Sequence, residues 1–133
     1  MRLTLRVERI LIVDDEKSIM FAMSHYFKGH GFDVDCAGDA ESARLFLDGR
    51  QYALAIVDIH LAGRAGMDGL DLAEWICRET ATPVIVMTAL ETPETEQRAA
   101  RIGVRSFVKK PARLAHLANV AFAALGHGPA QAV

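Results

Sequence analysis

Acidic side chains stand at the ends of two apolar runs in this sequence. Asp14 and Asp15 follow ILIV, and Asp58 ends LAIVD. Three carboxylates held close together raise one another's pKa unless a cation neutralises them. The sequence supplies these hard oxygen ligands and lacks metal-ligand spacings of cysteine or histidine, so the expected cation is Mg²⁺. The three acids therefore predict a magnesium site.

A hydroxyl group and a lysine end two further apolar runs. Thr88 and the small Ala89 follow VIVM, and Lys110 follows SFVK. A carboxylate beside Mg²⁺ and a lysine is a competent nucleophile toward phosphorus, and its attack would give an aspartyl phosphate. The metal and the lysine would balance the charge on the phosphoryl oxygens. The threonine hydroxyl can hydrogen-bond such an oxygen, and Ala89 leaves room for its approach.

Each of these residues has an ordinary structural explanation when it is taken alone. Asp14 could be the N-cap of the helix that follows, and Asp58 could form a turn. Thr88 is a common strand residue, and Lys110 could be a solvated surface charge. Their joint occurrence at the ends of four apolar runs favours phosphoryl chemistry over these separate explanations.

Alternating elements are predicted to bring these residues together. Strands are predicted over 9–13, 32–37, 53–57, 84–88 and 106–108. Helices are predicted over 16–28, 40–47, 70–78, 93–101 and 112–125. This alternation implies βαβ units and a parallel sheet with helices on both faces. Ligands bind such sheets outside the carboxyl ends of the strands, which is where the acids, the threonine and the lysine stand.

Capping residues and a polar strand support this division. Asp39 is a predicted N-cap, and Thr92 precedes a proline at the first position of a helix. Alternating apolar and acidic residues place 32–37 at an edge of the sheet. Three glycines are expected where helices stop: Gly29, Gly49 and Gly103.

Bulk composition is that of one globular domain. The chain has 133 residues, of which 51% are hydrophobic and 24% charged, and its net charge of −2 gives no general attraction to nucleic acid or anionic lipid. Cys36 and Cys77 are too few for a disulfide framework. No stretch resembles a membrane span or a signal peptide, so a cytoplasmic location is expected.

Taken together, the motifs resemble the receiver domain of two-component response regulators over residues 9–125. The matching features are DDE after the first strand, Asp58 after the third, TA after the fourth and KP after the fifth. The resemblance implies an α/β flavodoxin-like receiver fold, with a five-stranded parallel sheet of order 2-1-3-4-5. It also implies that Asp58 is a phosphoacceptor for a phosphohistidine of a partner protein.

Roles for the other site residues follow from the same resemblance. Asp14, Asp15, Asp58 and the backbone carbonyl of His60 would hold Mg²⁺. The phosphate would be bound by Thr88, Ala89 and Lys110, with Lys110 preferred over Lys109 because it precedes Pro111. The Lys110–Pro111 peptide bond is implied to be cis. Thr88 and Phe107 occupy the two positions that switch on activation.

One segment departs from the family pattern. Family members commonly have Met-Pro shortly after the acceptor and then a short path to the glycine matched here by Gly69. This chain has Leu61 and Ala62 instead, and roughly three extra residues follow, an insertion of modest thermodynamic cost. The altered loop is expected to affect the placement of the His60 carbonyl and hence the affinity for Mg²⁺.

The first predicted helix suggests a surface for a partner. At 100° per residue, its core stripe should contain four residues: Ile19, Ala22, Met23 and Tyr26. Phe21 then falls almost opposite, and Met20 lies on the flank. In receivers this helix docks on a histidine kinase or a histidine phosphotransfer protein. Phe21, Met20 and Pro111 are therefore candidate partner contacts, although incidental exposure would also explain the phenylalanine.

The favoured hypothesis is a single-domain response regulator. Residues 1–8 are expected to be an N-terminal extension and residues 126–133 a frayed tail, with no output domain after them. Without a helix-turn-helix or a basic stripe, nucleic-acid binding is not expected, so output would pass to a downstream protein target. The alternatives are a Mg²⁺-dependent phosphatase or phosphotransferase, which has no room for a substrate pocket, and a receiver-like binding module that works without phosphorylation.

Overall fold

A computed structural model of the chain describes residues 7–61, 68–89 and 92–126, in which strands and helices alternate. The strands are β1 (Arg9–Val13), β2 (Asp33–Ala37), β3 (Leu54–Asp58), β4 (Val84–Thr88) and β5 (Ser106–Lys109). The helices are α1 (Lys17–Gly29), α2 (Ala40–Gly49), α3 (Gly69–Glu79), α4 (Pro93–Ile102) and α5 (Leu114–Ala124).

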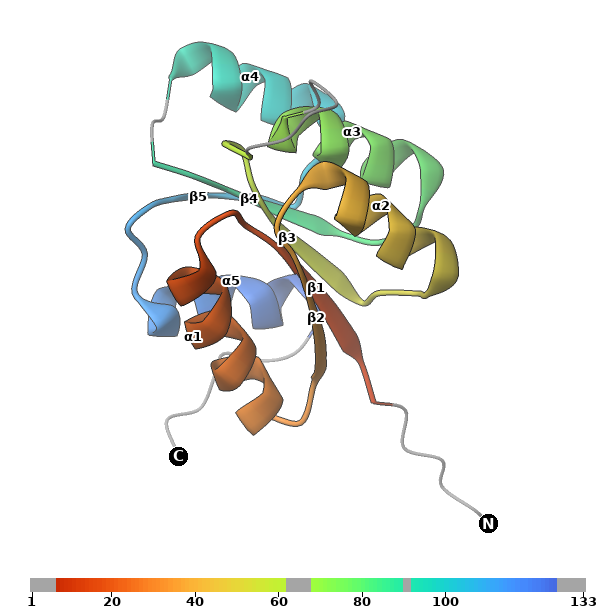
Figure 1. The fold of residues 1–133 in the computed structure, drawn as a ribbon. Helices are drawn as coiled ribbons and strands as arrows, with labels where there is room; N and C mark the ends of the chain where they lie inside the picture. Colours follow the sequence, from red (N-terminus) through yellow and green to blue (C-terminus); the bar gives the residue numbers. More distant parts are fainter. Residues whose placement is uncertain (1–6, 62–67, 90–91, 127–133) are drawn as a thin grey trace.

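The strands form one parallel sheet of order β2-β1-β3-β4-β5. Helices α2, α3 and α4 cover one face, and α1 and α5 cover the other (Figure 1). Right-handed crossovers between parallel strands place helices on both faces in this way. The predicted fold class and sheet order are confirmed.

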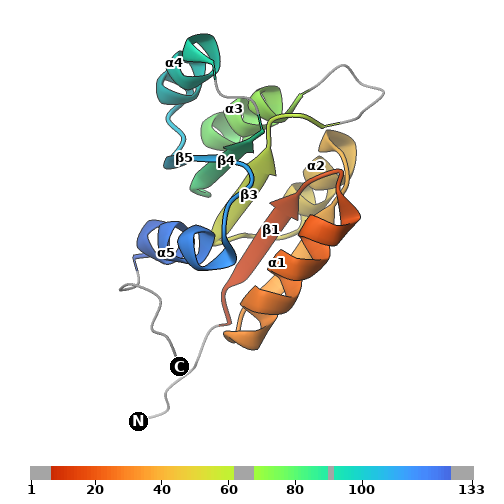
Figure 2. The ribbon, with the colours of Figure 1, turned by 90° about the vertical axis from the view of Figure 1, so that its left-hand side faces the viewer.

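Both faces of the central strands are buried. In β1, Ile10 and Ile12 pack toward α1 and α5, whereas Leu11 and Val13 pack toward α2 and α3. This explains why the strand reads as an unbroken apolar run and not as an alternating one. The buried strands fix the positions of the residues at their carboxyl ends. The carboxyl ends of β1 and β3 lie at the same end of the molecule (Figure 2).

The predicted N-cap residues Asp39 and Thr92 and the predicted helix end at Gly103 are confirmed. The Asp39 side chain accepts a hydrogen bond from the amide of Ser42 at 2.7 Å, and Thr92 forms a reciprocal capping box with Thr95. Gly103 ends α4 with a φ of 91°, a left-handed conformation that glycine adopts without a steric cost. These caps fix where the first turns of α2 and α4 begin.

Some predicted boundaries differ from the observed ones. Strand β2 begins at Asp33 and not at residue 32, because the amide of Phe32 donates to the carbonyl of Phe27 and closes the turn after α1. Strand β3 begins one residue later than predicted and includes Asp58. Helix α5 begins at Leu114, since its N-cap residue is still extended.

The core stripe of α1 was predicted one position away from its true centre. Met23 and Phe27 are the fully buried residues of this helix, and Ile19, Ala22 and Tyr26 are half-buried. The Phe27 ring meets the rings of Phe32 and Phe122 edge-on, at centroid distances of 6.1 and 6.2 Å. Contacts with Phe32, in the turn before β2, and with Phe122 of α5 therefore turn the buried face of the helix away from the face that periodicity predicts.

Candidate phosphoryl-transfer site

Two aspartates are buried side by side at the carboxyl ends of β1 and β3. These strands are neighbours, with Val13 paired with Val57, so the residues that follow meet at one edge of the sheet. Asp14 is 1% exposed and Asp58 is 4% exposed. Buried carboxylates need a compensating charge or hydrogen bonds to offset their lost hydration. The two acids are thus brought together as predicted.

Lys110 supplies that charge. Its Nζ lies 2.8 Å from Oδ2 of Asp14 and 3.1 Å from Oδ2 of Asp58, and the residue is only 8% exposed. Its backbone amide donates to the carbonyl of Thr88 at 2.7 Å, which anchors the lysine beside β4. The peptide bond to Pro111 is cis, and the neighbouring Lys109 is exposed. The geometry agrees with the choice of Lys110 over Lys109.

Each aspartate uses its other oxygen to shape the loop that follows it. Oδ1 of Asp14 accepts from the amide of Glu16 at 2.9 Å, and Oδ1 of Asp58 accepts from the amide of His60 at 3.1 Å. Asp14 does not cap α1, whose N-cap is Glu16. The turn-forming explanation of Asp58 therefore holds for one oxygen, while the other oxygen faces the lysine.

The pKa values of both Asp58 and Lys110 are raised above their ordinary values. Burial raises the pKa of the Asp58 carboxyl above its ordinary value, against the opposing effects of Lys110 and the His60 amide. Burial alone would lower the pKa of Lys110, but its hydrogen bonds to Asp14 and Asp58 outweigh that effect and raise it. The lysine is therefore cationic at neutral pH, and the Asp58 carboxyl is poorly solvated.

The oxygen donors beside this pair suit a hard divalent cation. Carboxylate oxygens of Asp14, Asp15 and Glu16 lie within 4.8 Å of one another, with Asp15 and Glu16 exposed to solvent. Glu16 Oε1 also lies 3.6 Å from Lys110 Nζ. An all-oxygen set with access to water fits Mg²⁺. Asp58, which is also predicted among the ligands, is not part of this acidic cluster and shares the Lys110 contact with Asp14, whereas Glu16, the third acid of DDE, is not among the predicted ligands.

The residues predicted to sense a phosphoryl group occupy different environments. Thr88 is completely buried at the end of β4, and Ala89 after it is exposed. Phe107 in β5 is half-buried and packs against the core cluster beneath α2 and α3. His60 is exposed directly after the buried end of β3. Residues 62–67, which include most of the loop with the predicted insertion of roughly three residues, lie outside the described residues.

Gly69 makes a contact whose cause could not be read from the sequence. Its amide donates to the carbonyl of Ile59 at 2.8 Å, which joins the first turn of α3 to the end of β3. A Cβ atom at this position would collide with the carbonyl oxygen of Asp58 and lie 2.6 Å from its carbonyl carbon. Only glycine allows the helix to approach Asp58 so closely. The family pattern marked the position, and the close approach supplies the physical reason.

The candidate partner residues of α1 form one side of a shallow groove. Phe21 is 75% exposed, and its ring stacks on that of His25 at a centroid distance of 6.2 Å. Met20 is half-buried and packs against the core. Pro111 is exposed beyond the lysine. A groove of about 320 Å³ is lined by Lys17, Met20, Phe21, Ser24, His25, Lys28 and Cys36.

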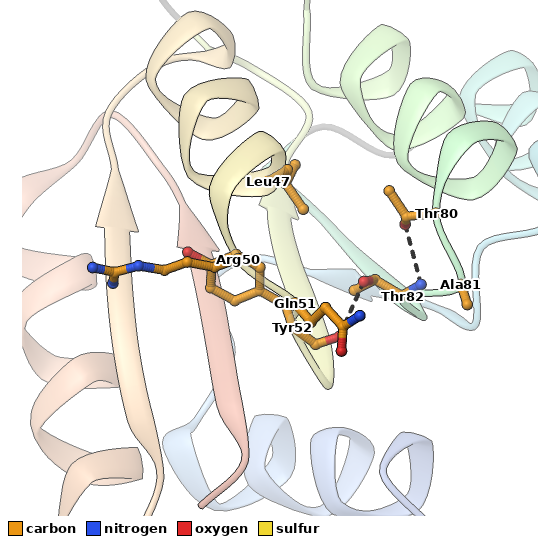
Figure 3. Close-up of a pocket in the computed structure, with 7 residues that line it drawn as sticks. All are labelled: Leu47, Arg50, Gln51, Tyr52, Thr80, Ala81 and Thr82. Atoms are coloured by element: carbon orange, nitrogen blue, oxygen red, sulfur yellow. Dashed lines mark hydrogen bonds between the residues drawn. The ribbon is translucent and has the colours of Figure 1, made fainter.

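A separate cavity of about 350 Å³ lies before the first residues of β3 and β4, away from the acidic end. It is lined by Leu47, Arg50, Gln51, Tyr52, Thr80, Ala81 and Thr82 (Figure 3). Thr82 donates its hydroxyl to the carbonyl of Tyr52 at 3.0 Å. Arg50 and the Tyr52 hydroxyl donate to Asp35 of β2, so their polar groups are already used. This cavity contains none of the predicted site residues.

Comparison with known proteins gives a consistent assignment. Residues 10–122 match the family described as "Response regulator receiver domain". Regulatory protein AtoC of Escherichia coli is 39% identical over 107 residues, which cover 79% of this chain and 22% of AtoC. Transcriptional regulatory protein TctD of Salmonella typhimurium is 29% identical over 110 residues, which cover 82% of this chain and 48% of TctD. The chain thus spans less than half the length of these relatives.

Solved structures agree with this match. The receiver domain of NtrX from Brucella abortus is 34% identical, with a TM-score of 0.80 over 88% of this chain and 98% of that one. A CheY-like receiver domain protein from Methanospirillum hungatei shares the fold at 24% identity, with a TM-score of 0.85 over 91% of this chain and 95% of the other. In the part of the chain that is described, no helix has the length and apolar character to cross a membrane. This chain belongs to the response regulator receiver domain family of two-component signalling systems.

Proposed function

We propose that Asp58 is the phosphoacceptor of this domain and that its phosphorylation is the signalling event. The observation that carries the proposal is the buried pair of Asp14 and Asp58 joined through Nζ of Lys110. A carboxylate held beside a fixed cation, at the carboxyl end of a buried strand, suits attack on an incoming phosphoryl group. The acting unit proposed here is the receiver domain of residues 9–125, working as a phosphorylation-dependent switch or relay.

The transfer is a nucleophilic displacement at phosphorus. One carboxylate oxygen of Asp58 forms a bond to phosphorus as the bond from phosphorus to the imidazole nitrogen of a partner's phosphohistidine breaks. The electron pair of that bond leaves with the imidazole. Lys110 then neutralises an oxygen of the transferred group, for which its Nζ must exchange the Asp58 contact for a phosphoryl contact.

Asp14, Asp15 and the backbone carbonyl of His60 would hold Mg²⁺, with Asp58 completing the set. The exposed Glu16 carboxylate adds a nearby oxygen. When bound, the ion would supply positive charge for the oxygens of the transferred group. The acidic cluster fits this ion because its donors are all oxygen and two of its side chains are open to solvent.

The signal would pass from the acceptor to the far face through Thr88 and Phe107. The Thr88 hydroxyl would hydrogen-bond an oxygen of the phosphoryl group, assisted by the small Ala89. Phe107 would then turn further inward and reshape the face formed by α4, β5 and α5. A downstream protein that reads this face is the proposed target.

A histidine kinase or histidine phosphotransfer protein is the proposed donor. Phe21 supports this role because an exposed aromatic ring beside the basic residues Lys17 and Lys28 can anchor a protein partner. Met20 and Pro111 would extend the same contact toward the acidic end of the sheet. The donor would thus contact both α1 and the loop after β5.

The test is phosphorylation by a small donor. Purified protein is incubated with Mg²⁺ and acetyl phosphate, and its intact mass is measured, with Asp58→Asn as the control. We expect one added phosphoryl group that requires Mg²⁺ and is absent from the variant. Failure to form the adduct, in protein whose circular dichroism is that of a folded α/β domain, would overturn the proposal. A phosphorylation-independent binding module would then be the better description.

A further inference from the structure

Helix α4 is joined to α3 by one arginine and three acids. Nη2 of Arg98 lies 2.5 Å from Oδ1 of Asp71 and 3.7 Å from Oε2 of Glu74, and Nη1 lies 4.0 Å from Oδ2 of Asp68. Asp71 and Glu74 share one face of α3, and Asp68 is the N-cap residue before its first turn. The hydrogen bond from Arg98 lowers the pKa of Asp71 below its ordinary value.

Among the described residues, α4 buries only a small apolar face. Ala99 is its fully buried residue, and Ile102 is half-buried against the core. Residues 93–97 are exposed or half-buried. A helix with so small an apolar face depends more than its neighbours on polar contacts for its position. The Arg98 contacts are therefore a substantial part of the attachment of α4.

The acids that Arg98 contacts also begin α3. The amide of Asp71 donates to Oδ1 of Asp68 at 2.8 Å, and the amide of Asp68 donates to Oδ2 of Asp71 at 3.2 Å. Gly69 directly follows Asp68. Its amide donates a hydrogen bond to the Ile59 carbonyl, and its Cα lies against the Asp58 carbonyl. A continuous set of contacts thus runs from α4 to the backbone of Asp58.

We propose that Arg98 is a positioning residue that couples the placement of α4 to the backbone of the phosphoacceptor. The coupling acts through the Asp68–Asp71 capping box and the contact of Gly69 with the end of β3. This inference rests on the proposed function of Asp58 and adds a means of regulation to it. Coupling between two binding sites is reciprocal. A protein that displaces α4 therefore changes the affinity of the Asp58 end for the phosphodonor by the same factor as the donor changes the affinity for that protein.

The first test is amide hydrogen exchange resolved by residue. In Arg98→Ala, the amides of α4 and the amide of Gly69 should exchange about two- to fivefold faster, the effect expected for partly exposed ion pairs. Arg98→Lys keeps the charge and should restore most of the protection. Arg101→Ala is the matched control, because Arg101 is exposed one turn later and pairs with no acid among the described residues.

The outcomes of the exchange experiment are distinct. Faster exchange in both α4 and Gly69, seen in Arg98→Ala and not in Arg101→Ala, supports the coupling. Faster exchange in α4 alone overturns it, since Arg98 would then attach the helix without affecting the acceptor. Unchanged exchange throughout also overturns it.

The second test measures phosphorylation of Asp58 by acetyl phosphate with Mg²⁺. Arg98→Ala should react about two- to fivefold more slowly than the wild type, Arg98→Lys should recover, and Arg101→Ala should be unaffected. High salt should slow the wild type toward the Arg98→Ala rate, because it screens the pair. A rate unaffected by Arg98→Ala would overturn the coupling. If the wild type is not phosphorylated at all, the proposed function fails, while exchange at Gly69 still tests the contact.

Discussion

The Cα of Gly69 lies so close to Asp58 that an added Cβ would come within 2.6 Å of the Asp58 carbonyl carbon. The obstacle is backbone and not a flexible side chain, so it cannot give way without moving the end of β3. Gly69→Ala should therefore destabilise the domain by about 1–3 kcal/mol, measured by urea unfolding. The matched control is Gly49→Ala at the end of α2, where a Cβ meets nothing within 4 Å. Equal stability of the two variants would contradict the contact.

Removal of Lys110 should lower the free energy of unfolding, because it leaves two buried acids without their shared cation. In Lys110→Met, Asp14 and Asp58 remain buried without their shared cation, and such a loss costs about 3–5 kcal/mol. Unfolding in a chelator measures this cost, and added Mg²⁺ should recover part of it. The exposed neighbour provides the control, because Lys109→Met should change stability by less than about 0.5 kcal/mol. A similar small loss in both variants would mean that Lys110 does not neutralise the pair.

Phosphotransfer from a protein donor should depend on Phe21. Loss of an exposed aromatic anchor costs about 1–2 kcal/mol at an interface, so Phe21→Ala should slow transfer from a histidine kinase by about tenfold. Acetyl phosphate should react with the variant at the wild-type rate. Leu45→Ala, on α2, changes an equally exposed residue (75%) and should affect neither reaction. Equal slowing with both donors would refute a docking role for Phe21.

Acid should weaken the fold partly through Asp35. Burial alone would raise the pKa of this carboxyl, but hydrogen bonds from Tyr52 and Arg50 and the charge of Arg9 lower it below its ordinary value. Since the folded-state pKa lies below that of the unfolded chain, Asp35 stabilises the fold above about pH 4, and this stabilisation is lost as the pH falls through the lowered pKa.

The corresponding measurement is the free energy of unfolding between pH 5 and pH 2, values that bracket the ordinary carboxyl pKa of about 4. Asp35→Asn should fall less steeply than the wild type across this range. Tyr52→Phe, which removes the 2.7 Å hydrogen bond to Asp35, should be intermediate. A slope that is unchanged in Asp35→Asn would show that this pair does not contribute to acid stability.

The sequence predicted a parallel sheet with its acids at one edge because both follow from the alternation of strands and helices, whereas the strand order came from the family resemblance. Apolar runs identified the buried strands β1, β3 and β4, and the carboxyl-end rule then placed Asp14 beside Asp58. The contact of Lys110 with both acids required the family resemblance, since a lysine at a strand end is most often solvated.

Other features depend on contacts that no local pattern encodes. Phe27 is buried because the rings of Phe32, in the turn before β2, and of Phe122 in α5 meet it, whereas periodicity alone favoured Tyr26. Arg98 pairs with acids on a different helix, and such a pair cannot be read from either helix alone. The close approach of Gly69 to Asp58 depends on where α3 begins in space.

The most direct test of the central claim is to locate the phosphoryl group. Protein treated with Mg²⁺ and acetyl phosphate is reduced with borohydride, which converts an acyl phosphate of aspartate into homoserine, and its peptides are mapped by mass spectrometry. We predict homoserine at position 58 and unmodified aspartate at Asp14 and Asp15. Homoserine at position 14 or 15, or none in the folded protein, would contradict the assignment of Asp58 as the phosphoacceptor.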